Sequence, residues 1–242
     1  MKNNNVLLEE LTDQLKAAFD TRLKSIVMFG SCAIGECNTL LSGVNLIVII
    51  DSLCANDLKT ANSFIKDWQK SKNPMPIFMD KDEWFNSTDV YPIEYTDIKE
   101  RHKIVYGEDV VTPLQIDSNN LRLQCELEIK NLLIKLRQTY LGLAKDKKVL
   151  EQLILLVSKS LTAIFRAILR YKQISGAKTH EQVIEKISEL INIDKEFFLK
   201  IVELKKNKKR IDKNEIDTTI QKLIDSINII LKYVDKLDKG EN

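Results

Sequence analysis

The sequence has few of the residues that build metal and redox sites. Its 242 residues include two histidines and four cysteines, and no two cysteines form a Cys-x-x-Cys pair. A structural zinc site needs four such ligands, usually at short spacings, so the sequence gives little support to zinc binding. The cysteines are expected to be reduced thiols.

Long apolar runs and a strong net charge are also missing. The apolar run "VNLIVII" is far shorter than the roughly 20 residues of a membrane span. The N-terminal "MKNNNVLLEELTDQL" becomes amphipathic at once and has neither the apolar run nor the cleavage site of a signal peptide. We therefore expect a cytoplasmic protein without membrane contact. A net charge of +2 predicts no strong attraction to nucleic acid or anionic lipid.

Short apolar segments fill the first half of the chain and predict a layer of helices and strands. Two segments have the spacing and start signals of helices, and two more are typical of buried strands. Two proline-flanked apolar runs, "PMPIFMD" and "YPIEYTDI", are predicted to be further strands near an edge of the sheet. The predicted helices are 5–19 and 55–70, the latter capped by Asn56 or Asp57, and the predicted strands are 23–30, 44–51, 74–80 and 91–98.

After Ser118 the spacing of apolar residues is almost entirely helical. About five helices are predicted, at 119–144, 147–173, 178–191, 195–206 and 213–237. The segment 149–169 is apolar on most of its circumference, which places it at the centre of a bundle. We therefore predict an α+β chain with a mixed-sheet domain at 1–117, flanked by helices, and a helical bundle domain at 118–242.

The segment "FGSCAIGECNTLLSGVNLIVIID" begins at Phe29 and joins two predicted strands through a glycine turn. Because Gly30 tolerates positive φ and close approach, Gly30 and Ser31 can expose backbone amides to a phosphate group. A glycine and a serine after a strand are also compatible with an ordinary tight turn. The surrounding residues decide between these interpretations.

The segment resembles the signature of the polymerase-beta type nucleotidyltransferase superfamily, in which a Gly-Ser turn precedes a carboxylate-x-carboxylate pair. The small members commonly read GSxARGExxxxSDIDLLV. Residues 89–110 also resemble the third-strand region of small bacterial members, so the resemblance covers about residues 5–115. The matching residues of the first motif are Gly30, Ser31, Ala33, Gly35, Glu36, Ser42, Leu46 and Val48.

The same alignment places the family's catalytic carboxylates on residues that carry no charge. Its two aspartates fall on Gly43 and Asn45, and its arginine falls on Ile34. Nucleotidyl transfer by this family uses two Mg²⁺ ions held by carboxylates. Gly43 offers no ligand atom and Asn45 offers one neutral oxygen. The resemblance therefore implies a nucleotidyltransferase fold whose catalytic pair is degenerate.

Other carboxylates were considered as replacements. Glu94 and Asp97 are candidates for the third carboxylate of the family, although the polar face of a partly exposed strand is the favoured interpretation of both. Glu36 lies in the loop and is more typical of a solvated charge. Asp51 lies about 20 Å from Asn45 along a strand, which is too far to share a metal ion.

The remaining polar features give weaker indications. His102 and His180 have no cysteine or serine partner at a recognisable spacing, so no catalytic dyad is supported. The Arg-x4–6-His motif of the helical ribonucleases that accompany small nucleotidyltransferases is absent. The basic run 205–213 could contact phosphates, but without interleaved aromatic residues a solvated turn is favoured, and nucleic acid is not the expected partner.

The favoured hypothesis is a catalytically inactive nucleotidyltransferase-like protein. It would bind a nucleotide, with weak or no dependence on Mg²⁺, or a protein partner, which includes a second copy of itself bound through the helical domain. One alternative is an active Mg²⁺-dependent enzyme that modifies a small molecule or protein with Glu94, Asp97 and Glu36. Another is a structural dimerisation module.

Overall fold

The computed structural model describes residues 4–35, 43–177, 179–207 and 209–237. The chain separates into two compact units, Met1–Ile116 and Asp117–Asn242. Each unit has its own secondary structure and buried residues, and each is described by itself.

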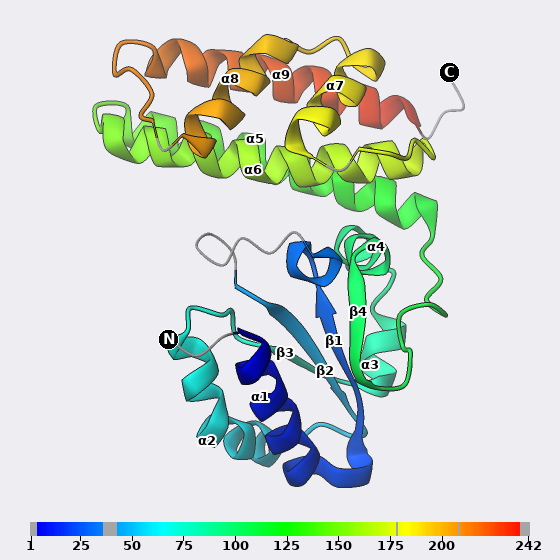
Figure 1. The fold of residues 1–242 in the computed structure, drawn as a ribbon. Coiled ribbons are helices and arrows are strands. Elements are labelled where there is room, and N and C mark those ends of the chain that lie inside the picture. Colours follow the sequence, from blue (N-terminus) through cyan, green and yellow to red (C-terminus); the bar gives the residue numbers. More distant parts are fainter. Residues whose placement is uncertain (1–3, 36–42, 178, 208, 238–242) are drawn as a thin grey trace. The chain divides into compact units, whose positions relative to one another are not determined.

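A four-stranded sheet forms the middle of the first unit (Figure 1). In space its order is β3-β2-β1-β4, with β1 antiparallel to both neighbours and β3 parallel to β2. The sheet is therefore mixed, as predicted, and β3 lies at an edge. The strands are β1 Leu23–Phe29, β2 Asn45–Ile50, β3 Ile77–Asp80 and β4 His102–Gly107.

Helices cover both faces of this sheet. Because side chains alternate between the faces of a strand, Leu46 and Val48 pack into one core and Ile47 and Ile49 into another. The first core includes the apolar stripes of α1 (Asn4–Phe19) and α2 (Ala55–Lys70). The second includes side chains of α3 (Lys81–Asn86), α4 (Pro92–Glu100) and the segment 110–116.

The segment "YPIEYTDI" forms α4, so its prediction as a strand is wrong. Pro92 occupies the first turn of this helix, where its fixed φ suits a helix and its missing N–H costs nothing. Tyr95 and Ile98 then follow at helical spacing and are buried. The fourth strand of the sheet is instead formed by the following segment, β4, which was not predicted as a strand.

Asp57 stabilises the first turn of α2, but it is not the N-cap residue as the sequence suggested. The N-cap is Cys54, and its backbone N–H donates to the Asp57 carboxylate at 3.0 Å. Arg22, at the end of the short 3-10 helix Asp20–Arg22, donates to both oxygens of the same carboxylate at 2.6 and 3.1 Å. These hydrogen bonds, with that from Arg22 the largest effect, hold the pKa of Asp57 well below its ordinary value. The pair therefore contributes stability above about pH 4 that is lost as the pH falls further.

The second unit consists of helices, as predicted. Their boundaries lie within a few residues of the predicted ones. The helices are α5 Ser118–Leu143, α6 Lys147–Tyr171, α7 His180–Leu190, α8 Lys195–Lys206 and α9 Ile216–Lys236.

Helix α6 is the central element of this unit, because it contacts α5, α7, α8 and α9. Among the described residues it is the one helix long and apolar enough to cross a membrane, with a mean hydropathy of 1.6 over its most apolar window. Within that window 56% of the helix is buried in the protein. The core helix of a bundle has these same properties, so the composition of α6 is explained by its neighbours.

Candidate functional site

Three neighbouring strands meet at the end of the sheet that carries the glycine turn. Phe29, the last residue of β1, is paired with Asn45 of β2 on one side and with His102 of β4 on the other. Directly paired residues point to the same face, and Phe29 packs into the core shared with α3 and α4. The side chains of Asn45 and His102 therefore lie on that face; we call these three residues the Asn45–His102 row.

Gly30 follows this row and connects β1 to the short 3-10 helix η2, Ser31–Ile34. Its φ is +80°, a conformation that favours glycine, and its N–H donates to the Arg101 carbonyl at 2.8 Å. Among the described residues, a Cβ at Gly30 would meet a single atom within 4 Å, the Asn45 side-chain nitrogen at 3.2 Å. The space on the Cβ side of Gly30 therefore holds the Asn45 amide, whereas the Gly30 N–H is already used by the Arg101 carbonyl and is not exposed to a phosphate as the sequence analysis expected.

Gly43 lies two residues before the row and is tightly packed. A Cβ built on Gly43 would lie 2.6 Å from Pro74 Cδ, 2.7 Å from Asn73 Cα and 2.8 Å from the Lys72 carbonyl oxygen. Contacts this short are essentially never tolerated by a real Cβ. Gly43, to which the sequence resemblance assigns the family's first aspartate, therefore has no room for a side chain.

The loop that closes over Gly43 is itself held in place. The Asn73 side-chain oxygen accepts the Val44 N–H at 2.9 Å, and Trp68 donates its indole N–H to the Pro74 carbonyl at 2.8 Å. Asn73 is 5% exposed, and its side-chain nitrogen has no hydrogen-bond partner among the residues that the structure describes. These contacts fix the start of β2 and hence the position of Asn45.

Glu94 and Asp97 lie on helix α4 and not on a strand, so they do not occupy the strand position of the family's third carboxylate. Asp97 forms an ion pair with Arg101, one turn further along the chain. Glu36 lies outside the described residues. Within the described part of the chain, no group of three or more His, Cys, Asp or Glu side chains could hold a metal ion.

His102 lies in the same row as Asn45, a position that the sequence reasoning did not give it. Its Nδ1 lies 3.1 Å from the Lys99 carbonyl oxygen. His102 also helps to lower the pKa of Asp109, although hydrogen bonds from Thr112 are the largest cause. The apolar run "KIVY" directly after His102 is a sequence signal for a strand that begins at this residue. That His102 shares a row with Asn45 could only be found from the strand register.

The cysteines differ in state. Cys54 and Cys125 are free, as expected. Cys32, in η2, is disulfide-bonded, so the expectation of reduced thiols is wrong for this residue.

Comparison with known proteins identifies the fold. No protein-family model matches the chain, and no curated protein matches it. Among solved structures, it is similar to the crystal structure of spectinomycin adenyltransferase AAD(9) from Enterococcus faecialis with ATP and spectinomycin. The TM-score is 0.61 at 14% identity, over 93% of this chain and 100% of that one. The architecture of this chain is therefore nucleotidyltransferase-like.

Proposed function

We propose that the chain binds a nucleotide at the Gly30 turn and does not catalyse metal-dependent nucleotidyl transfer. The observation that carries the proposal is the packing of Gly43, which leaves no space for the first catalytic carboxylate. Asn45 replaces the second. Two divalent ions must be held by anionic oxygen to stabilise the attacking and leaving groups of this reaction. Loss of both carboxylates removes that charge. The Gly30 N–H is used by the Arg101 carbonyl, so we assign the contact with the nucleotide at this turn to Ser31, the first residue of η2.

An active enzyme with a rearranged site is less well supported. Asp97 is engaged by Arg101 and both Asp97 and Glu94 lie on α4, so they do not form a pair on adjacent strand positions. The nucleotidyltransferase-like fold makes nucleotide binding plausible without either residue. We propose that the protein is bacterial and acts in the cytoplasm.

Calorimetry with ATP, GTP and CTP, each with Mg²⁺ and with EDTA, tests this proposal. We expect at least one nucleotide to bind weakly, with an affinity that changes less than about tenfold, or 1.4 kcal/mol, when Mg²⁺ is removed. No pyrophosphate should be released, under conditions in which a spectinomycin adenyltransferase releases it. A gain of about a hundredfold with Mg²⁺ would place a working metal site in this chain.

A matched pair of serine variants locates the binding. If the nucleotide lies on the Gly30 turn, Ser31→Ala should weaken binding by about threefold to tenfold, the effect of one hydrogen bond. Ser63→Ala, on an exposed part of α2, should have no effect. Equal affinities for the two variants would move the nucleotide away from this turn.

A second candidate function is association through the helical unit. Helix α5 buries one face in the bundle and exposes Leu123, Leu127, Ile134 and Leu141 on the opposite side. Their spacing of four and seven residues places them on a single face of the helix. An apolar stripe of this kind is typical of an interaction surface.

Sedimentation measures this association. We expect a dimer at micromolar concentration, and we expect the double variant Leu127→Glu with Ile134→Glu to be monomeric, because it puts charge in the centre of the stripe. Leu58→Glu, on an exposed part of α2, is the control. A wild-type chain that remains monomeric at high concentration would remove the support for self-association.

A further inference from the structure

We propose that the helical unit binds double-stranded nucleic acid through basic side chains of α6 and of the segment that follows α8. This inference goes beyond the proposed function, because the surface lies in the second unit and does not involve the Gly30 turn. The basic patch, as we call it, consists of Lys159 of α6, Lys205 in the last turn of α8, and Lys209 and Arg210 after it.

The small net charge of the whole chain conceals two units of opposite charge. Residues 117–242 contain 25 Lys and Arg and 18 Asp and Glu, so the helical unit carries a net charge of +7. Residues 1–116 contain 12 Lys and Arg and 17 Asp and Glu, a net charge of −5. A basic unit attracts polyanions even when the chain as a whole is close to neutral. The expectation that nucleic acid is not a partner was based in part on the sum of these charges.

The described part of the basic run 205–213 is held against the bundle. The Lys209 N–H donates to the Leu204 carbonyl at 2.9 Å, which closes the turn after α8. The Ile211 N–H donates to the Glu151 carboxylate of α6 at 2.9 Å, and the Ile211 side chain is 6% exposed. The basic side chains of this segment are therefore presented from a backbone that is anchored on α6.

The patch brings positive charges of two helices together. Helices α6 and α8 are in contact. Partial desolvation of the Lys205 ammonium and, to a smaller extent, the nearby charge of Lys159 lower the pKa of Lys205. The two ammonium groups therefore repel each other, and an anionic oxygen beside both would offset this repulsion.

The members of the basic patch have no carboxylate partner within the described part of the chain. Other lysines of α8 do have one, since Lys200 is paired with Glu215 at 2.9 Å and Lys206 with Glu181 at 3.7 Å. A cation that is already paired must give up its partner to bind a phosphate. The patch can therefore contact phosphates without breaking an ion pair of the described residues.

The composition of the basic run favours a duplex over other polyanions. Proteins that bind single strands stack the bases on aromatic side chains, and 205–213 contains no aromatic residue. Binding at a membrane surface buries apolar side chains beside the cations, and the one apolar residue of the run, Ile211, is already buried in the protein. A duplex carries one negative charge per about 1.7 Å of its axis and can be held by phosphate contacts alone. We therefore expect binding that does not depend on base sequence.

Fluorescence anisotropy of the intact chain with labelled duplexes tests the proposal. Two duplex DNAs of unrelated sequence, each of about 20 base pairs or two helical turns, should bind with similar affinity. Each neutralised phosphate contributes about −0.9 to the slope of log K against log salt, so four contacts predict a slope of about −3 to −4. Duplex RNA of the same length is measured beside the DNA. Binding to either duplex supports the proposal, and the ratio of the two affinities identifies the preferred one.

A matched pair of double variants locates the binding. Lys205→Gln with Lys209→Gln should lower the affinity for the duplex at least about tenfold at physiological salt and should reduce the slope by about 2. Lys195→Gln with Lys236→Gln removes the same charge from the far ends of α8 and α9 and should leave the slope unchanged. All four lysines lie at exposed positions, so both double variants should fold. If one does not, the salt dependence of the wild type still decides whether a duplex is bound.

Four results would overturn the proposal. The first is that neither duplex binds, and the second is that single strands of the same sequences bind more tightly than the duplexes. Equal losses in the two double variants would mean that the total charge of the helical unit, and not the basic patch, attracts the duplex. Tighter binding to vesicles of phosphatidylcholine and phosphatidylserine than to either duplex would make an anionic membrane the partner. ATP binding at the Gly30 turn is tested separately and is independent of all four.

Discussion

Replacing Gly107 by alanine is expected to cost the first unit about 3 kcal/mol or more of its unfolding free energy. Gly107 ends β4 with φ at +81°. A Cβ at this residue would lie 1.9 Å from the Lys24 carbonyl oxygen and 2.8 Å from its carbonyl carbon. The same oxygen accepts the Glu108 N–H at 2.9 Å, so the added methyl group must displace the backbone and break this bond.

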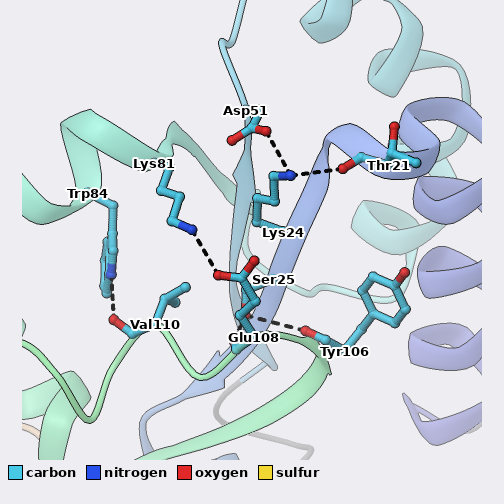
Figure 2. Close-up of polar contacts among 9 residues, drawn as sticks. All are labelled: Thr21, Lys24, Ser25, Asp51, Lys81, Trp84, Tyr106, Glu108 and Val110. Atoms are coloured by element: carbon cyan, nitrogen blue, oxygen red, sulfur yellow. Dashed lines mark hydrogen bonds and ion pairs between the residues drawn. The ribbon is translucent and has the colours of Figure 1, made fainter.

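The residues around Gly107 leave little freedom for such a shift. Figure 2 shows that Ser25, which is fully buried, donates to the carbonyl oxygens of Tyr106 and Glu108 at 3.3 and 2.8 Å. The Glu108 carboxylate is paired with Lys81 at 2.9 Å. Backbone and side chains thus hold both sides of the turn, and strain at Gly107 cannot be relieved by one side chain alone.

Gly35→Ala is the matched control for this prediction. Gly35 has nearly the same φ, +79°, but no atom of the described residues lies within 4 Å of its Cβ position. Against the described residues, the free-energy cost of Gly35→Ala should be limited to the backbone strain of about 1–2 kcal/mol. Both tryptophans, Trp68 and Trp84, lie buried in the first unit, so tryptophan fluorescence during urea unfolding reports on this unit. Equal costs for the two variants would show that the Lys24 backbone yields easily.

Periodicity predicted most of the fold because it reflects local geometry. The helix ending in Phe19 and the helices of the second unit present apolar residues at the 3.6-residue period, and the packing follows that pattern. The strand Asn45–Ile50 was predicted from a continuous apolar run, and it is buried on both faces by two cores.

The sequence-based predictions were wrong or incomplete in two situations. Either a local sequence signal fits two structures, or the residues in contact are far apart in the sequence. Proline before an apolar run suits an edge strand or the first turn of a helix, and at Pro92 it begins a helix. Likewise, His102 looked isolated because its relation to Asn45 passes through β1. The contact of Gly43 with Lys72–Pro74 joins segments about thirty residues apart, and no spacing rule predicts it.

The same contact bears on whether carboxylates could be introduced at the two positions that the resemblance assigns to the family's aspartates. The sequence alone suggests that Gly43→Asp with Asn45→Asp would return two carboxylates to one face and restore metal binding. The structure favours a different result, because the two positions differ in space. Asn45 is half-buried with its amide beside Gly30, whereas Gly43 is closed off by the loop.

Gly43→Asp is therefore expected to destabilise the first unit by about 1–3 kcal/mol, the usual cost of overpacking, before any metal is added. Gly43→Ala should show most of this loss, since the Cβ itself meets Pro74 Cδ, Asn73 Cα and the Lys72 oxygen at 2.6–2.8 Å. Asn45→Asp adds charge without adding a Cβ and should cost less than about 1 kcal/mol. Tryptophan fluorescence in urea measures all three.

Adding Pro74→Ala to Gly43→Asp tests whether contact with the loop causes the loss of stability. It removes the nearest of the three contacts, and the other two are backbone atoms that it leaves in place, so it should restore only part of the stability. Mn²⁺ binding in the presence of ATP should remain as weak in Gly43→Asp with Asn45→Asp as in Asn45→Asp alone. A double variant that is as stable as the wild type and binds Mn²⁺ tightly would contradict this account. It would mean that the loop at Lys72–Pro74 moves aside at little free-energy cost. It would also mean that the wild type lacks metal binding only because the two carboxylates are missing.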